Sequence, residues 1–313
     1  MPVHVPPQAL PSLGALHISG ADALAYLQGQ LSADLGPLQA GQLGWAGLHT
    51  PQGRVLALLA LAPLASGDDW VAVLPAALAG SAATALRRFV LRARVSISVS
   101  PPGSVCLPGE AAVAGEPPEG THALRHPDGA QLLWLPAGGA GDADDAAQAE
   151  WERRQVALGL PQVHPETSGM FVAQMLNLDC IGAIAFDKGC YTGQEVVARA
   201  HYRGRVKRRM QRFSSATLPA APGGGGLRPG STLRLADGRT AQLVRAAAQA
   251  DGSTEWLAVC AWPATGQAQD GVANNAPADP AGNPAGGGAV DNAPDAASAV
   301  DSRPLPLPYP LPE

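Results

Sequence analysis

The feature that most constrains the fold is a regular alternation of short apolar strands with helices over the first hundred residues. Apolar residues alternate in LGALHISG (13–20), as in a half-buried strand, and the next segment, ADALAYLQGQLSADL (21–35), has the cap and composition of a helix. The further predicted elements are strands at 43–50, 55–64, 70–75 and 94–100 and a helix at 77–93. Such alternation is typical of mixed α/β lobes.

Beyond residue 100 the pattern changes. Residues 101–150 are rich in Gly, Pro and Asp and contain one clear strand, QLLWLP (131–136), which predicts a reduced, loop-rich segment. A helix is predicted over 149–163, and residues 164–186 are expected to be extended up to the decapeptide FDKGCYTGQE. We predict that residues 1–205 form the first unit of the chain.

The remaining part, residues 206–313, has the pattern of a small C-terminal β-barrel. Three short alternating strands are separated by the turns RPG, ADGR and ADGS. Residues 265–302 consist largely of Gly, Pro, Ala, Asn and Asp, so we expect a disordered insert. The last segment, RPLPLPYPLPE (303–313), is expected to return to the barrel as an edge strand or a polyproline stretch.

Composition excludes several classes of protein. With 46% hydrophobic residues the chain can bury more than one core, and its formal net charge of -5 disfavours direct nucleic-acid binding over a whole surface. The N-terminus has no signal-peptide pattern, and the longest apolar run, 55–65, is too short to span a bilayer. We therefore expect a cytoplasmic protein with no membrane segment.

The decapeptide contains one of the two lysines of the chain and one of its four cysteines. Cys190 lies between Gly189 and Gly193 and close to Lys188, a setting that favours the thiolate and makes a thiol nucleophilic or metal-binding. The other cysteines lie in apolar runs and are predicted to be buried; they are Cys106, Cys180 and Cys260. We predict that Cys190 is the functional centre and that Lys188 supports it. The alternative is a tight structural turn.

The cysteine and histidine spacings match no zinc site, and we predict no metal site.

The stretch IGAIAFDKGCYTGQEVVARAHYRGRVKRRM resembles the signature of the YgfZ-type folate-binding protein family. The mark of that family is the motif K-G-C-Y-x-G-Q-E, which is matched by Lys188, Gly189, Cys190, Tyr191, Gly193, Gln194 and Glu195. Weaker similarity extends over 18–35, 87–97, 159–179 and the tail 306–313. Residues 101–150 and 265–302 show no such similarity.

This resemblance implies an α+β fold like that of the aminomethyltransferase of the glycine cleavage system, with three lobes around a central folate site and a small β-barrel last. It also implies a tetrahydrofolate-binding accessory factor that assembles or maintains iron–sulfur clusters in selected enzymes, among them a radical enzyme that methylthiolates tRNA. The expected partners are iron–sulfur client enzymes or cluster-assembly proteins.

Two alternatives stay open on the sequence. One is a folate-dependent one-carbon (aminomethyl) transferase, and the other is an RNA-binding or scaffold protein. The paired aspartates of the transferase pattern appear here as Ala57 and Leu58, which argues against the first alternative, and the net negative charge argues against the second. Whether the chain catalyses a reaction stays open.

The resemblance also implies two tryptophans that contact folate. Trp151 matches the later one and is expected to stack on a ring of the cofactor, although packing into the core is the alternative; the earlier position is occupied by Leu13. The basic segment 199–212 is predicted to place alternate residues, including Arg205, on one strand face and to grip the glutamate tail of folate or an acidic partner. The residues predicted to contact the cofactor are Trp151, Tyr191, Gln194, Glu195, Arg199 and Arg203.

Overall fold

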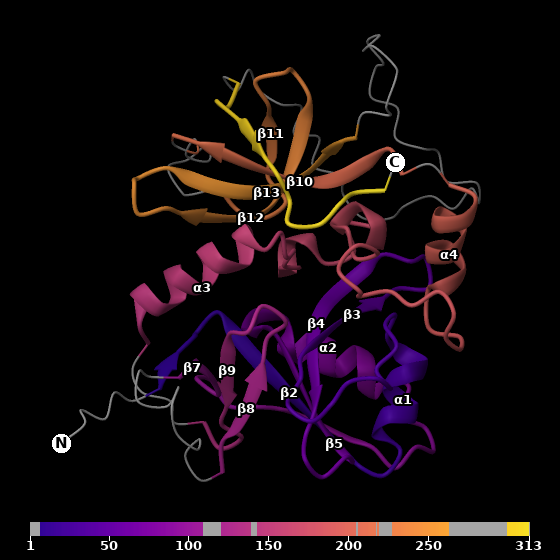
Figure 1. The fold of residues 1–313 in the computed structure, drawn as a ribbon. Helices are drawn as coiled ribbons and strands as arrows, with labels where there is room; N and C mark the ends of the chain where they lie inside the picture. The colour runs from indigo at the N-terminus through magenta and orange to yellow at the C-terminus, as the bar shows by residue number, and fades with distance from the viewer. Residues whose placement is uncertain are drawn as a thin grey trace, which may run out of the picture.

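The computed structural model describes residues 7–108, 120–138, 143–204, 206–216, 218, 227–262 and 299–312. The disorder predicted for residues 265–302 falls almost entirely outside these ranges, as does Arg205. Three β-sheets build the described part of the chain, two in the N-terminal half and one in the C-terminal part (Figure 1). The helix α3 (Asp145–Ala157) lies between the two halves.

The first sheet has five antiparallel strands in the order β3-β4-β5-β2-β6. Its strands are β2 (Leu13–Ser19), β3 (Gly44–His49), β4 (Val55–Pro63), β5 (Asp69–Pro75) and β6 (Ser96–Val99). Side chains on one face, such as Leu16 and Ile18, pack with the helices α1 (Ala23–Gln30) and α2 (Ala76–Arg87). Because both faces are covered, β4 reads as a nearly continuous apolar run, VLALLALAP.

The second sheet covers the other face of the first and has the order β1-β7-β9-β8. Its strands are β1 (Gln8–Ala9), β7 (Val105–Leu107), β8 (His122–Arg125) and β9 (Gln131–Trp134). The sequence predicted one strand in 101–150, whereas the structure has three there. Strands of three or four residues carry little periodicity, and tertiary pairing decides them.

The C-terminal sheet has five antiparallel strands in the order β11-β12-β13-β10-β14. They are β10 (Arg208–Ser215), β11 (Thr232–Arg234), β12 (Thr240–Ala248), β13 (Thr254–Ala261) and β14 (Arg303–Leu305). Among the described residues, the segments at its two edges meet in one parallel bridge, Leu235 to Val300. Of the segment 303–313, predicted as an edge strand or a polyproline stretch, residues 303–305 form the edge strand β14. A closed barrel stays a prediction.

The connection between α3 and the decapeptide differs from the sequence expectation. Residues 164–186 were predicted to be extended, but the structure contains two short 3-10 helices, η1 (Pro165–Thr167) and η2 (Ala173–Leu176). Asn177 ends η2 in the left-handed region at φ 56°, where its side-chain amide donates to the Met210 carbonyl. These turns are fixed by contacts with β10, which local sequence does not reveal.

The predicted strand face of the basic segment is wrong for its first half. Residues 194–202 form the helix α4 (Gln194–Tyr202), so Arg199 and His201 do not alternate across a strand. The strand β10 begins later, at Arg208. None of the helices described here combines the length and the apolar character that crossing a bilayer requires.

Candidate functional site

The decapeptide forms a turn that Lys188 fastens to the segment after α1. Its ammonium donates hydrogen bonds to the carbonyl oxygens of Leu31, at 2.8 Å, and Ala33, at 2.6 Å. Burial lowers the pKa of Lys188 to about 8, against a smaller opposing effect of Asp34. The ammonium also lies 5.5 Å from the centroid of the Tyr191 ring. Lys188 therefore anchors the turn.

Cys190 is the accessible thiol of the chain. It is exposed, whereas Cys106 and Cys260 are fully buried and Cys180 is partly buried. Burial raises the pKa of Cys106 and of Cys260 to about 11, and burial together with Asp179 raises that of Cys180 to about 12. The sequence singled out the same cysteine, and the structure leaves its sulfur open to a partner.

Gly193 shows why the motif needs a glycine after the tyrosine. Its φ is 83°, and a Cβ there would lie 2.5 Å from the Thr50 carbonyl oxygen, in the turn between β3 and β4. Only glycine allows this close approach. The turn thereby brings Tyr191 next to His49, with ring centroids 6.2 Å apart, and both side chains are buried.

The other predicted cofactor contacts in this region lie on or near α4. Gln194 is half-buried and accepts a long hydrogen bond, 3.4 Å, from the Tyr191 backbone. Glu195 and Arg199 form an exposed ion pair at 3.0 Å, and Arg203 is exposed at the end of the helix. The structure thus places Glu195, Arg199 and Arg203 on the surface and Gln194 partly below it.

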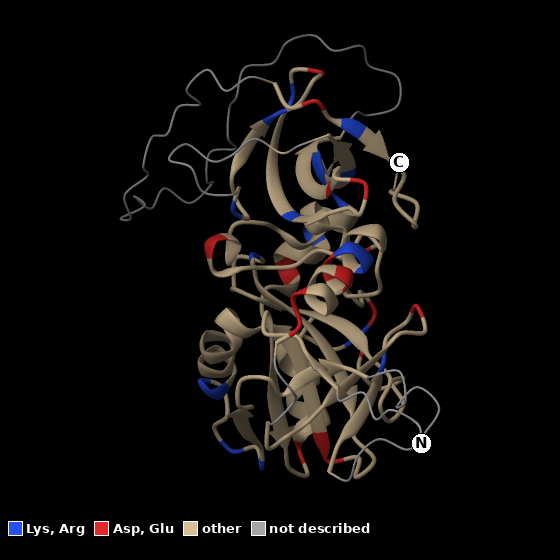
Figure 2. Ribbon diagram, turned by 90° about the vertical axis from the view of Figure 1, so that its left-hand side faces the viewer, with Lys and Arg blue, Asp and Glu red and all other residues tan. Residues whose placement is uncertain are grey.

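Further along the basic segment, two arginines are engaged in ion pairs. Arg209 is buried and pairs with Asp179 at 2.8 Å, and Arg212 pairs with Glu255. In the described part of the chain, Lys and Arg are interspersed with Asp and Glu and do not form one continuous band in the view of Figure 2. The basic segment is therefore in part a structural element.

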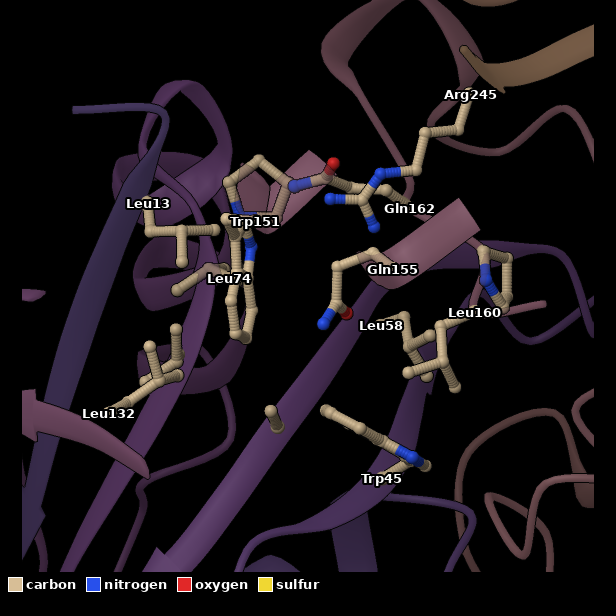
Figure 3. Close-up of a pocket in the computed structure, with 14 residues that line it drawn as sticks. Leu13, Trp45, Leu58, Leu74, Leu132, Trp151, Gln155, Leu160, Gln162 and Arg245 are labelled. Carbon is tan, nitrogen blue, oxygen red and sulfur yellow. The ribbon is translucent and has the colours of Figure 1, made fainter. Parts of the chain in front are cut away.

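A separate cavity of about 50 Å³ lies where α3 meets the three sheets. Its walls include Trp151 from α3, Trp45 from β3, Leu13 from β2 and Arg245 from β12 (Figure 3). Trp151 and Leu13, which the sequence analysis compared with the two folate-contacting tryptophans, line the same space. No residue of the decapeptide or of α4 lines it, so the structure divides the predicted site into a cavity and a surface turn.

Most residues of this cavity were not identified from the sequence, among them Trp45, Gln155 and Arg245. Trp45 stands in the predicted strand 43–50, where alternation indicates a face but not the partner across it. Arg245 is only 5% exposed; its Nε donates to Glu152 at 2.6 Å, and its Nη2 has no partner among the described residues. The indole Nε1 of Trp151 is likewise buried without one. Other buried polar atoms of the described residues, such as Tyr191 Oη, also lack a partner, but these two donors border a cavity where a ligand or water can accept from them.

The described residues contain no group of three or more His, Cys, Asp and Glu side chains placed to hold a metal ion.

Comparison with known proteins identifies the relatives of the chain. No family model matches it. The tRNA-modifying protein YgfZ of Edwardsiella ictaluri is 33% identical over 276 residues, which cover 78% of this chain and 81% of that protein. The chain belongs to the YgfZ family. The tRNA-modifying protein YgfZ of Klebsiella pneumoniae is 30% identical over 261 residues, covering 75% of this chain and 78% of that protein.

A solved structure confirms the predicted fold of this member of the YgfZ family. Aminomethyltransferase T of the glycine cleavage system from Bartonella henselae superposes with a TM-score of 0.60 at 15% identity, covering 81% of this chain and 77% of that one. At this identity the likeness shows the fold alone. The aminomethyltransferase-like α+β fold and the family predicted from the K-G-C-Y-x-G-Q-E motif are both confirmed.

Proposed function

We propose that the chain binds a reduced folate such as tetrahydrofolate in the cavity beside α3. The observation that carries this proposal is the pair of unpaired buried donors, Trp151 Nε1 and Arg245 Nη2, in a space that two tryptophans line. Flat heteroaromatic rings gain from aromatic faces, and a guanidinium suits the carbonyl and carboxylate groups of folate. A bound reduced folate would supply a carrier for one-carbon groups.

The side chains that line the cavity suit the groups of this cofactor, but the cavity is too small to hold it in this structure. Its volume of about 50 Å³ is well below the range of roughly 300–1,000 Å³ that small-molecule sites occupy. Binding therefore requires side chains to move apart, and Trp45 is a candidate because its side chain is only partly buried. The fold around them, with strands from three sheets, supplies the fixed frame.

An accessory role is favoured over the one-carbon transferase. At the positions of the paired aspartates in the transferase pattern, Ala57 is buried and Leu58 lines the cavity with an apolar side chain. Among the described residues that line the cavity, none is a carboxylate. With no carboxylate in this lining, and with the nearby Glu152 paired to Arg245, the cavity offers no free carboxylate as a general base for chemistry on the cofactor.

We further propose that the exposed Cys190 turn serves iron–sulfur enzymes or cluster-assembly proteins in the cytoplasm, including an enzyme that methylthiolates tRNA. Its support is the accessible thiol on a turn that Lys188, Tyr191 and Gly193 hold in place. The names of the relatives, which refer to tRNA modification, agree with a client of this kind.

Titration of the purified protein with reduced folates by calorimetry tests the cofactor. Trp151→Ala and Trp45→Ala should each weaken binding by about 1 kcal/mol, or roughly fivefold, the scale of an aromatic contact. Trp262→Ala, outside the cavity, serves as the matched control. Failure of the intact protein to bind any reduced folate would overturn the cofactor proposal.

Complementation of a cell that lacks its own YgfZ protein tests the surface turn. Cys190→Ala should fold normally and lose support of tRNA methylthiolation, while Cys106→Ala, which changes a buried thiol, should keep it provided that it folds. Full complementation by Cys190→Ala would show that the turn is structural.

A further inference from the structure

A chain of hydrogen-bonding groups runs from the protein surface to the cavity. It begins at Arg154 on α3, whose Nε donates to Asp128 Oδ2. Asp128 stands in the turn between β8 and β9, where the Ala130 backbone N–H donates to its Oδ1 at 2.9 Å. The same Oδ1 lies 2.7 Å from Nδ1 of His126, which is 4% exposed. The His126 ring is thus held from one side.

These contacts fix which nitrogen of His126 carries the hydrogen. Although burial alone would raise the pKa of Asp128, the hydrogen bond from Arg154 and its other partners lower it to about 2, so the carboxylate is charged and can only accept. The Asp128 backbone N–H also lies near Nδ1, at 3.4 Å, but the carboxylate is much closer. Nδ1 therefore carries the hydrogen.

The other nitrogen of His126 is then a hydrogen-bond acceptor. Burial lowers the pKa of His126, against the opposing charge of Asp128, so the ring is neutral near pH 7 and its Nε2 holds a lone pair. That nitrogen lies 3.5 Å from the amide nitrogen of Gln155. A neutral Nε2 can receive only the NH2 end of this amide.

Gln155 projects from α3 into the cavity between the Trp151 and Trp45 side chains (Figure 3). With its NH2 end directed to His126, its carbonyl Oε1 is left as an acceptor for a ligand in the cavity. The His126 ring also contacts both tryptophans edge-on, with centroids 5.2 Å from Trp45 and 5.7 Å from Trp151. One imidazole thus orients the amide and supports both aromatic walls.

We propose that Gln155 is the specificity-determining residue of the cavity and that the chain of Arg154, Asp128 and His126 positions its amide as an acceptor. This inference rests on the proposed function and adds which hydrogen-bonding groups the ligand must carry at the edge that faces Gln155. The cavity presents an acceptor at Gln155 and unpaired donors at Trp151 Nε1 and Arg245 Nη2. It therefore takes a flat heteroaromatic ring that has an N–H donor at one edge and acceptors elsewhere, as the aminopyrimidine edge of a pterin has.

Two small ligands that differ in one group test this assignment. The 2-position of 6-methylpterin is an amino group, a donor, whereas that of 6-methyllumazine is a carbonyl, an acceptor. The intact protein should bind the pterin more tightly, by about tenfold, the effect of roughly one hydrogen bond. Saturation-transfer NMR titration measures both affinities, and a titration with tetrahydrofolate accompanies them.

The decisive variant is Asp128→Asn, which does not touch the cavity. The two carboxylate oxygens of Asp128 accept from Arg154 on one side and from Ala130 and His126 on the other, and the single oxygen of an amide cannot serve both sides. The chain of hydrogen bonds is then broken at residue 128 and the Gln155 amide is no longer held in one orientation. The preference for the pterin should therefore fall to nearly equal binding of both ligands. Gln155→Leu should abolish the preference.

Glu150→Gln is the matched control, since it makes the same chemical change at an exposed position of α3 and should keep the pterin preference. If Asp128→Asn does not fold, as judged by thermal unfolding, Gln155→Leu carries the test alone. Unchanged pterin preference in the variants, or an equal loss of both ligands, would overturn the role of Gln155 and leave the folate proposal intact. Failure of the intact protein to bind either ligand or tetrahydrofolate would overturn both.

Discussion

Each residue of the family motif makes different contacts within the turn. Lys188 is bound to two backbone carbonyls, Tyr191 is buried against His49, and Gly193 permits the approach to the β3–β4 turn. Cys190 is the motif residue whose reactive atom faces outward among this group. The contacts of the lysine support a role in holding the turn, since it donates to the Leu31 and Ala33 carbonyl oxygens.

At the same scale, alkylation should distinguish Cys190 from the other thiols. With iodoacetamide at about pH 8, Cys190 should react first because it is exposed. Cys106 and Cys260 are buried and Cys180 is partly buried, and their raised pKa values keep all three as protonated thiols, which react slowly. Mass spectrometry of peptides over time measures the order. In Cys190→Ala the early modification should disappear, and rapid labelling of a buried cysteine would contradict the structure.

Among the elements, α3 connects the parts of the site. It contributes Trp151 and Gln155 to the cavity, pairs Glu152 with Arg245 of β12, and packs on the C-terminal sheet. Its first turn is capped by Asp144, whose Oδ1 accepts from the Ala146 and Ala147 backbone N–H groups. The start of the helix therefore also fixes the direction in which Trp151 points.

Removal of this cap should destabilise the protein modestly. Asp144→Ala leaves two backbone donors of α3 without their partner, which should cost about 1 kcal/mol of unfolding free energy. Asp144→Asn, which retains a side-chain oxygen, should lose much less. Urea unfolding followed by circular dichroism measures both, and equal values for the two variants would argue against capping as the cause.

A buried ion pair ties the η2 region to β10. Asp179 and Arg209 are nearly inaccessible, and Arg209 also donates to the Gln174 carbonyl. Asp179→Ala leaves a buried guanidinium without its charge partner and should cost about 3–5 kcal/mol. Glu195→Ala breaks the exposed pair with Arg199 on α4 and should barely change stability. The urea unfolding midpoints of the two variants measure these losses of stability. Similar midpoints for Asp179→Ala and Glu195→Ala would contradict the expected difference.

Periodicity in the sequence predicted the longer elements and failed where tertiary contacts decide. Strand β4 lies in its predicted range, and helix α3 forms over 145–157 where a helix was predicted at 149–163. Each element has enough residues to show a period, but the period does not fix the ends of the helix. The region 164–186 was predicted extended and contains 3-10 turns, which Asn177 and the contacts with β10 impose. The motif likewise indicated Cys190, but the meeting of Trp45 with Trp151 depends on packing between distant segments.

At the scale of the whole molecule, three histidines stand at junctions between its parts. His49 lies where the motif turn meets β3, His126 lies beside the cavity, and His164 follows α3. Burial lowers the pKa of each of them. Because a buried neutral histidine resists protonation, the folded chain should become less stable in mild acid.

His49 gives the clearest test of this acid sensitivity. Burial lowers its pKa from 6.5 to about 4, and neither ring nitrogen has a partner among the described residues. Below pH 6.5 the unfolded chain takes up a proton that the folded chain refuses until about pH 4, so the free energy of unfolding falls across this window, by about 3 kcal/mol for this group. Urea unfolding at a series of pH values should show a shallower decline for His49→Leu than for the original chain. His201→Leu, at an exposed histidine of α4, should retain the full decline. An identical decline in His49→Leu would show that His49 is not responsible for the acid sensitivity.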